Sequence, residues 1–168
     1  MIPIIIMIIS LLLDGILTNF LPFMVNDLSL YTPLFTVVSI FFLYPFYRKN
    51  NKKYWLIVFT LGIVYDLFYT NLLFLNAILF LGVAYVSKVI YKNYEVDFIK
   101  LIIYLVIIIV VYESMTGIII FLYHLVPVTF EKVIYKISHS LLLNIIYGEI
   151  IYFLLKVVPK KYKKISIN

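Results

Sequence analysis

The sequence predicts an all-α integral membrane protein, a bundle of six transmembrane helices with both termini in the cytoplasm. Of its 168 residues, 65% are hydrophobic and 13% are charged, whereas soluble domains carry about 25% charged residues. The mean hydropathy is +1.10. The apolar runs do not alternate with polar residues as barrel strands do, so helices are expected to satisfy the backbone within lipid.

Six spans follow from the apolar runs, since a transmembrane helix needs about 20 apolar residues, with a range of about 17–25. The first run stops at Pro22, and Pro33 suits the first turn of the second span. The long apolar stretch around Asp66 is too long for one span and predicts a hairpin that turns at Asn71. We expect one domain over residues 1–168, with spans at about 2–21, 33–47, 54–70, 74–87, 101–123 and 133–155.

The placement of basic residues predicts the orientation. Of the 14 Lys and Arg residues, all but Lys132 and Lys136 follow spans two, four or six. Because cytoplasmic loops carry the excess of Lys and Arg, both termini are expected to be cytoplasmic. The net charge of +6 is therefore assigned to helix orientation and anionic membrane lipids rather than to nucleic acid. The basic tail is either a lipid anchor or a contact for a cytoplasmic partner.

Catalytic, cofactor and metal sites are not expected. The chain has no Cys, which excludes disulfides, thiol catalysis and Cys metal ligands. Neither His124 nor His139 has a carboxylate four residues away to complete a helical metal pair. The sequence contains no glycine-rich phosphate loop, nucleophile elbow or nucleic-acid motif.

Four carboxylates fall within the expected spans, at Asp14, Asp66, Glu113 and Glu149. A charge at the centre of a bilayer costs at least about 2.5–3.5 kcal/mol, and we expect no Lys or Arg within a span to neutralise them. They should therefore face the bundle interior, a cavity or a partner. The predicted topology places Asp14 and Asp66 in the outer halves of parallel helices, where they can meet and share a proton.

Small and polar residues accompany these acids at helical spacing. Gly62, Asp66 and Thr70 lie four residues apart on one helix face, and the string D-x-x-x-T-N occurs at both 14–19 and 66–71. A similar stripe surrounds Asn144 and favours helix packing over a ligand site. The candidate site residues are Asp14, Thr18, Asn19, Gly62, Asp66, Thr70, Asn71, Asn76, Glu113 and Asn144.

Three interpretations of Asp14 and Asp66 remain open. They can form hydrogen bonds between helices of the bundle, accept hydrogen bonds from a partner's transmembrane helix or periplasmic segment, or form a proton or substrate site.

The run GIVYDLFYTNLLFLNAILFL at residues 62–81 resembles the most characteristic part of MreD, the rod shape-determining membrane protein of bacteria. Gly62, Asp66 and the segment 75–77 stand at the places of the family's Gly, its Asp and its Leu-x-Asn/Arg-Ala-like segment. The family often has Gly where this chain has Thr70 and Phe74. The opening Pro33 and the segment SLLLNIIYG also resemble family members, and elsewhere the likeness is one of hydropathy.

The resemblance implies a six-helix fold similar to the substrate-binding S components of ECF vitamin transporters. It implies a non-enzymatic scaffold of the cell-wall elongation complex in the bacterial cytoplasmic membrane. Such a scaffold would bind MreC and work with RodA, its penicillin-binding partner and the MreB filament. The polar positions, including Gly62, Asp66, Thr70 and Asn71, would set the fit to the transmembrane helix of MreC.

Two other functions are considered. An S component would bind a small vitamin-like ligand, but the first span lacks the Ala-x-x-x-Ala pattern by which such proteins commonly dock their transporter. A proton-coupled transporter would use Asp66 and Glu113. Inverted repeats would support this function, whereas the two copies of D-x-x-x-T-N run in the same direction.

Overall fold

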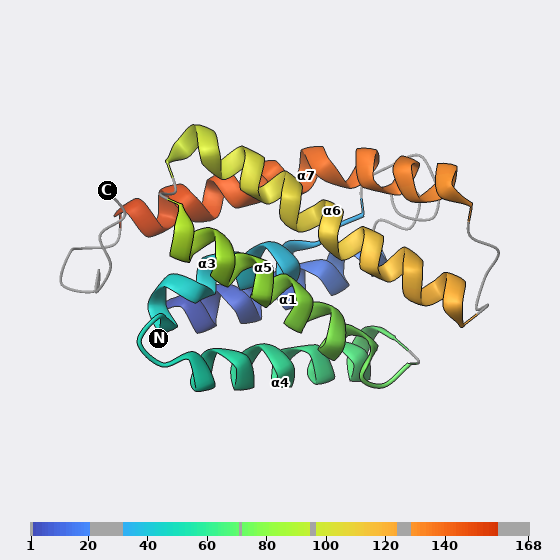
Figure 1. The fold of residues 1–168 in the computed structure, drawn as a ribbon, viewed down its shortest axis with the longest axis horizontal. Coiled ribbons are helices and arrows are strands. Elements are labelled where there is room, and N and C mark those ends of the chain that lie inside the picture. The colour runs from blue at the N-terminus through green and yellow to red at the C-terminus, as the bar shows by residue number, and fades with distance from the viewer. Residues whose placement is uncertain (1, 21–31, 71, 95–96, 124–128, 158–168) are drawn as a thin grey trace.

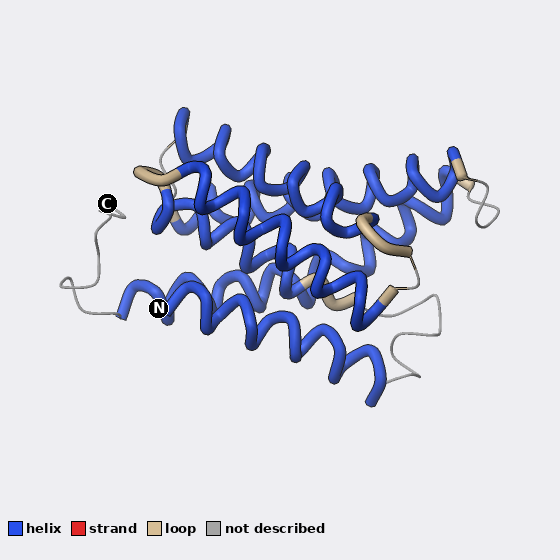
Figure 2. The backbone as a smooth tube through the Cα atoms, turned by 90° about the horizontal axis from the view of Figure 1, so that it is seen from below, coloured by secondary structure: helices blue, strands red, loops and turns tan. Residues whose placement is uncertain are grey.

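The computed structural model describes residues 2–20, 32–70, 72–94, 97–123 and 129–157, and all regular structure within them is helical (Figures 1 and 2). The described helices are α1 (Ile2–Phe20), α3 (Phe35–Tyr47), α4 (Asn51–Tyr69), α5 (Leu75–Asn93), α6 (Phe98–Leu122) and α7 (Phe130–Val157). The prediction of an all-helical chain with six helices is confirmed for this part of the chain.

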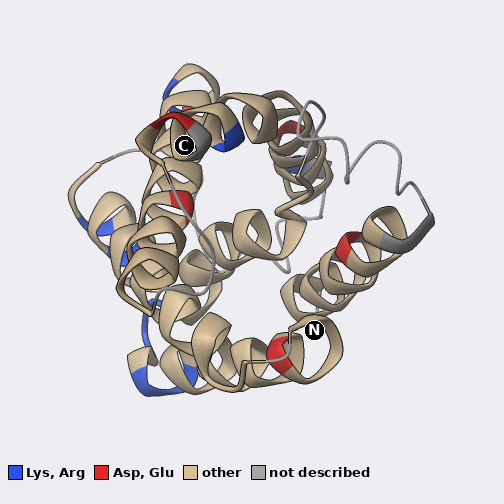
Figure 3. Ribbon diagram, turned by 90° about the vertical axis from the view of Figure 1, so that its right-hand side faces the viewer, with Lys and Arg blue, Asp and Glu red and all other residues tan. Residues whose placement is uncertain are grey.

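The six described helices form three antiparallel hairpins, and α3 of the first hairpin is the central helix. The pairs α1–α3, α4–α5 and α6–α7 share the most extensive contacts, and α3 packs against each of the other five helices. Figure 3 views this bundle of helices end-on. Because α3 is apolar on all sides, it can be buried along its whole surface, and its residues 35–45 are all buried.

The outward faces of the surrounding helices are also apolar. Large aliphatic side chains such as Ile8 on α1, Leu56 on α4 and Ile99 on α6 are exposed. Water would disfavour so much exposed apolar surface, whereas lipid tails are as apolar as these side chains. The buried centre and the apolar exterior of this helical bundle suit a protein embedded in a lipid bilayer.

Within the described residues, three helical segments are long and apolar enough to cross a membrane, namely Leu75–Asn93, Phe98–Leu122 and Val133–Lys156. Two further apolar helices, Ile2–Thr18 and Phe35–Tyr47, are shorter. With 13 residues, α3 rises about 20 Å against a hydrocarbon core of about 30 Å. The helix at the expected second span is thus about two-thirds as long as the hydrocarbon core is thick, because α3 begins only at Phe35, inside the bundle.

All helices alternate in direction, so α1 begins and α7 ends on the same side of the bundle (Figure 1). The short connections from α3 to α4 and from α5 to α6 lie on this side too. These connections and the adjoining helix ends carry most of the described basic residues, which are Arg48, Lys49, Lys52, Lys53, Lys88, Lys92 and Lys100. We call this the basic end and the opposite side the acidic end, since Asp14, Asp66 and Glu113 lie toward it.

Candidate functional site

Asp66 binds the start of α5. Its two carboxylate oxygens each accept a hydrogen bond from the Asn76 backbone N–H at 3.0 Å. They also accept bonds from the Asn76 side-chain amide at 2.8 Å, the Ala77 N–H at 3.3 Å and the Thr70 hydroxyl at 2.9 Å. The residue is fully buried. Asp66 therefore caps the N-terminus of a neighbouring helix, whose partial positive charge offsets the burial of the carboxylate.

The capped helix start is joined to a third helix. The Asn76 side-chain oxygen accepts a hydrogen bond of 2.9 Å from the Tyr112 hydroxyl on α6. A continuous chain of hydrogen bonds thus runs from the half-buried Thr70 to the buried side chains of Asp66, Asn76 and Tyr112. It ties α4, α5 and α6 together toward the acidic end.

Gly62 permits the close approach that this chain requires. A Cβ atom built on Gly62 would overlap Cα of Ala77 and lie 2.6 Å from its backbone nitrogen. The backbones of α4 and α5 are therefore in contact one turn before Asp66. The turn between them includes Phe74 at φ 69°, a left-handed conformation that glycine adopts without a steric penalty.

Asp14 plays the corresponding part in the first hairpin. One carboxylate oxygen accepts the Phe35 N–H at 2.8 Å, and the other accepts the Thr36 N–H at 2.9 Å. Its bonds thus go to the start of α3, whereas those of Asp66 go to the start of α5. The expectation that Asp14 and Asp66 share a proton is wrong, because each carboxylate is engaged by a different helix N-terminus.

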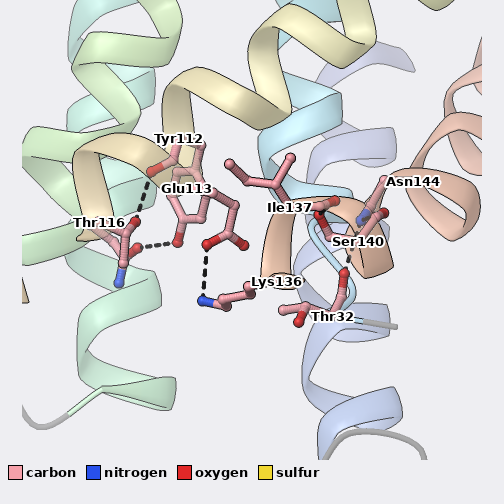
Figure 4. Close-up of polar contacts among 9 residues, drawn as sticks. Thr32, Tyr112, Glu113, Thr116, Lys136, Ile137, Ser140 and Asn144 are labelled. Carbon is pink, nitrogen blue, oxygen red and sulfur yellow. Dashed lines mark hydrogen bonds and ion pairs between the residues drawn. The ribbon is translucent and has the colours of Figure 1, made fainter. Parts of the chain in front are cut away.

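Asn144 completes the cap of α3. Its side-chain oxygen accepts the Leu34 N–H at 2.7 Å, and its amide donates to the carbonyls of Thr32 at 2.9 Å and Ser140 at 2.7 Å (Figure 4). Three successive backbone N–H groups, at residues 34–36, are thereby satisfied by side chains of α1 and α7. A helix can begin inside the bundle only when such partners replace water.

The two copies of the D-x-x-x-T-N repeat form the same arrangement of hydrogen bonds. In both copies the aspartate caps the second helix of its own hairpin, and the threonine four residues on donates to the aspartate's backbone carbonyl. This bond measures 2.7 Å for Thr18 and 3.3 Å for Thr70. The side chain of Asn19 and the whole of Asn71 lie outside the described residues.

The third hairpin uses an ion pair instead of a cap. Lys136 of α7 lies 3.0 Å from a carboxylate oxygen of Glu113 on α6, and Figure 4 shows the two side chains pointing toward each other. Glu113 is 2% exposed and Lys136 is 44% exposed. The expectation that no basic residue within a span neutralises an acid is wrong, because Lys136 extends from α7 to Glu113.

Some contacts were not predicted from the sequence. Tyr112 and Lys136 complete the polar chains above, and the Ser10 and Tyr147 hydroxyls lie 2.7 Å apart between α1 and α7. Tyrosine is too common in this chain for any one to stand out. Among the described residues, no three His, Cys, Asp or Glu side chains gather into a group that could hold a metal.

A comparison with protein families matches residues 1–161 to the family described as rod shape-determining protein MreD. The chain belongs to the MreD family. The match includes all six described helices and both aspartate caps. Searches of curated proteins and of solved structures found no match.

Membership of the MreD family gives the chain a role in determining rod shape. MreD proteins are shape-determining proteins rather than a known enzyme family. Together with the three helices able to cross a bilayer, the family places the chain in a membrane.

Proposed function

We propose that this chain is a non-enzymatic scaffold of the bacterial cell-wall elongation complex. It binds MreC in the cytoplasmic membrane and assembles with RodA, its penicillin-binding partner and MreB. The observation that carries this proposal is the MreD match over residues 1–161. The use of the buried acids supports it, because Asp14 and Asp66 are engaged in capping helices and Glu113 in pairing with Lys136.

The scaffold is one transmembrane domain whose six helices are fixed to one another by the capping carboxylates. A partner helix then meets a rigid apolar surface, so little ordering entropy is lost on binding. Gly62 and Asp66 set the shape of this surface from inside. This changes the role expected of them, since both are buried against α5 and act by positioning helices rather than by touching MreC.

The basic end faces the cytoplasm in this proposal. Arg48, Lys49, Lys52 and Lys53 are grouped at the α3–α4 connection, and such groups are retained on the cytoplasmic side. They also attract anionic lipid head groups. Lys53 and Lys88 additionally lie 5.8 and 5.9 Å from the rings of Tyr47 and Trp55, which suits residues at a membrane interface.

The test is purification of the tagged chain from its native membrane, with an unrelated tagged membrane protein as the control. We expect MreC to co-purify with this chain and not with the control, and depletion of the chain to turn rods into spheres. Retained rod shape together with absence of MreC would contradict the proposal. Recovery of a bound vitamin-like molecule in place of MreC would favour the S-component alternative.

A further inference from the structure

Glu149 is the one carboxylate in an expected span for which the described residues provide no partner. The other three are engaged in helix caps and in an ion pair. In the described part of the chain, no hydrogen bond or ion pair reaches the carboxylate of Glu149. The residue lies inside the segment Val133–Lys156, which is long and apolar enough to cross a membrane. An ionisable group in such a place is expected to have a partner.

The side chain of Glu149 lies on the outer side of α7. The inner side of the helix is marked by the adjacent Gly148, which is buried, and a Cβ atom built there would overlap a methyl group of Leu105 on α6. Residues that share the outer side recur three or four positions apart and are exposed or partly exposed. They are Leu142, Ile146, Glu149, Ile150 and Phe153. We call this surface the Glu149 face.

The helix that carries this face is covered less than its neighbours. Of the three described segments able to cross a membrane, that of α7 has the smallest share buried, 28% against 39% for α6 and 44% for α5. Figure 1 shows α7 along one edge of the bundle. Its mean hydropathy is nevertheless only 1.4, against 2.5 for α6. Because lipid tails are as apolar as Leu, the least covered helix would be the most apolar one if lipid alone surrounded it.

The chemistry of the Glu149 face decides among its possible occupants. Acyl chains offer no donor to a carboxylate. Lys156, seven residues on, is about 10 Å further toward the basic end, where anionic lipid head groups would repel Glu149. A second copy that used the same face would bring two Glu149 carboxylates together, and like charges disfavour each other. A Lys or Arg side chain of another protein supplies the donor and the opposite charge.

We propose that the Glu149 face binds a transmembrane helix of another protein, which carries a Lys or Arg side chain that pairs with Glu149. The apolar residues of the face pack against that helix. The ion pair fixes the position of the helix along α7, because either charge alone would be costly in lipid, and charge complementarity gives specificity. The inference requires that the chain lie in a membrane, but it does not require the partner to be MreC.

Photocrosslinking of the tagged full chain in its native membrane tests the face. A photoreactive phenylalanine derivative replaces Ile146 or, as the control, Leu56 on α4, which is exposed and lies across the bundle from α7 (Figure 1). We expect position 146, and not position 56, to be crosslinked to a transmembrane segment of another protein that contains Lys or Arg, identified by mass spectrometry of the crosslinked peptide. A product with lipid alone, with a second copy of this chain, or with a helix that has no basic residue would overturn the inference.

A charge exchange separates the ion pair from general helix packing. Glu149→Lys should lower the yield of the position-146 crosslink about tenfold, as for loss of one member of a buried charge pair. Changing the partner's Lys or Arg to Glu should restore the yield with this variant. An unchanged yield for Glu149→Lys, or no recovery on exchange, would overturn the pairing.

Two neutral variants serve as a matched pair. Glu149→Gln keeps the shape of the side chain and should also lower the yield, so the inference stays testable if the lysine variant fails to fold. Asp97→Asn makes the same change at an exposed ion pair at the same end of the bundle and should alter the yield less than twofold. Equal losses for the two variants would contradict a specific role of Glu149. Thermal unfolding in detergent monitors the folding of each variant.

These outcomes are separate from those of the proposed function. If MreC co-purifies with the chain but position 146 yields only lipid products, the scaffold function stands and the Glu149 face is overturned. If MreC does not co-purify but a basic helix of another protein is crosslinked and responds to the charge exchange, the inference stands without MreC.

Discussion

Asp66 lies on α4 and accepts hydrogen bonds from the first backbone N–H groups of α5. In most helices a polar residue at the N-cap of the same helix has this role. The N-cap position of α5 is Phe74, which has no side-chain oxygen and makes no cap hydrogen bond. The backbone N–H groups of Asn76 and Ala77 therefore depend on Asp66. A hydrogen bond to a charged group contributes about 1.5–3 kcal/mol, and an unsatisfied buried donor costs about 1–3 kcal/mol.

Replacing Asp66 by Leu should consequently lower the free energy of unfolding by about 3 kcal/mol or more, since at least two buried N–H groups lose their acceptor. Asp66→Asn retains one carbonyl acceptor and should fall between Leu and wild type. Thermal unfolding in detergent measures the order of stability of wild type, Asp66→Asn and Asp66→Leu. Asp97→Asn, at a half-exposed side chain, is the control and should change stability by less than about 0.5 kcal/mol. Equal stability of Asp66→Leu and wild type would refute the capping role.

Phe74 is the second residue with a testable conformation. Its φ of 69° costs a non-glycine residue about 1–2 kcal/mol. Phe74→Gly should relieve this strain, while Phe74→Ala keeps it and loses the ring contact with Phe59. We expect the glycine variant to be more stable than the alanine variant by at least about 1 kcal/mol, measured by thermal unfolding. An alanine variant as stable as the glycine variant would show that the turn is not strained.

At the scale of elements, each hairpin brings its two helices together by a polar contact toward the acidic end. The first two use an aspartate and a helix N-terminus, and the third uses Glu113 and Lys136. The cap works only if the helices approach closely, which is why Gly62 lies against Ala77. In the first hairpin the same capping allows α3 to begin inside the bundle.

Substitution of two glycines separates backbone contact from side-chain contact. A Cβ at Gly62 meets the Ala77 backbone, whereas one at Gly82 meets only the flexible end of Met115. Gly62→Ala should destabilise the protein by about 1–3 kcal/mol, as overpacking does. Gly82→Ala should cost clearly less, because Met115 can move. The comparison is made by thermal unfolding in detergent, and similar losses for both variants would contradict direct packing of α4 on α5.

At the scale of the whole molecule, the six described helices leave one charged end. The alternation of directions brings all the connections rich in Lys and Arg to the basic end. With 28 residues in α7 and 13 in α3, the described helices differ in length by more than a factor of two. A scaffold of this shape offers different surfaces on the two sides of a membrane.

The absence of cysteine from the sequence makes this orientation easy to test. Single-cysteine variants Lys49→Cys at the basic end and Tyr123→Cys at the end of α6 would be treated in intact cells with a thiol reagent that does not cross membranes. We expect labelling of position 123 only, and labelling of position 49 once the membrane is opened. Labelling of both positions in intact cells, or of position 49 alone, would contradict cytoplasmic termini.

The sequence by itself determined the helical class, the number of described helices and the MreD family, and it singled out Gly62, Asp66 and Asn76 as candidate site residues. These follow from local composition, from residue spacing within one helix and from a short motif, all of which are read along the chain. The D-x-x-x-T-N repeat was also visible in the sequence, but its role in capping helices was not.

Only the tertiary structure decided what each acid binds. The partners of Asp14 are backbone N–H groups 21 and 22 residues away. The residue type does not reveal which backbone N–H group needs a side-chain acceptor, so the sequence could not identify these partners. Lys136 lies 23 residues from Glu113, and only the packing of α6 on α7 brings them together. Helix spacing in a sequence shows which side chains share a face, but the helix opposite that face is decided by the packing of the whole bundle.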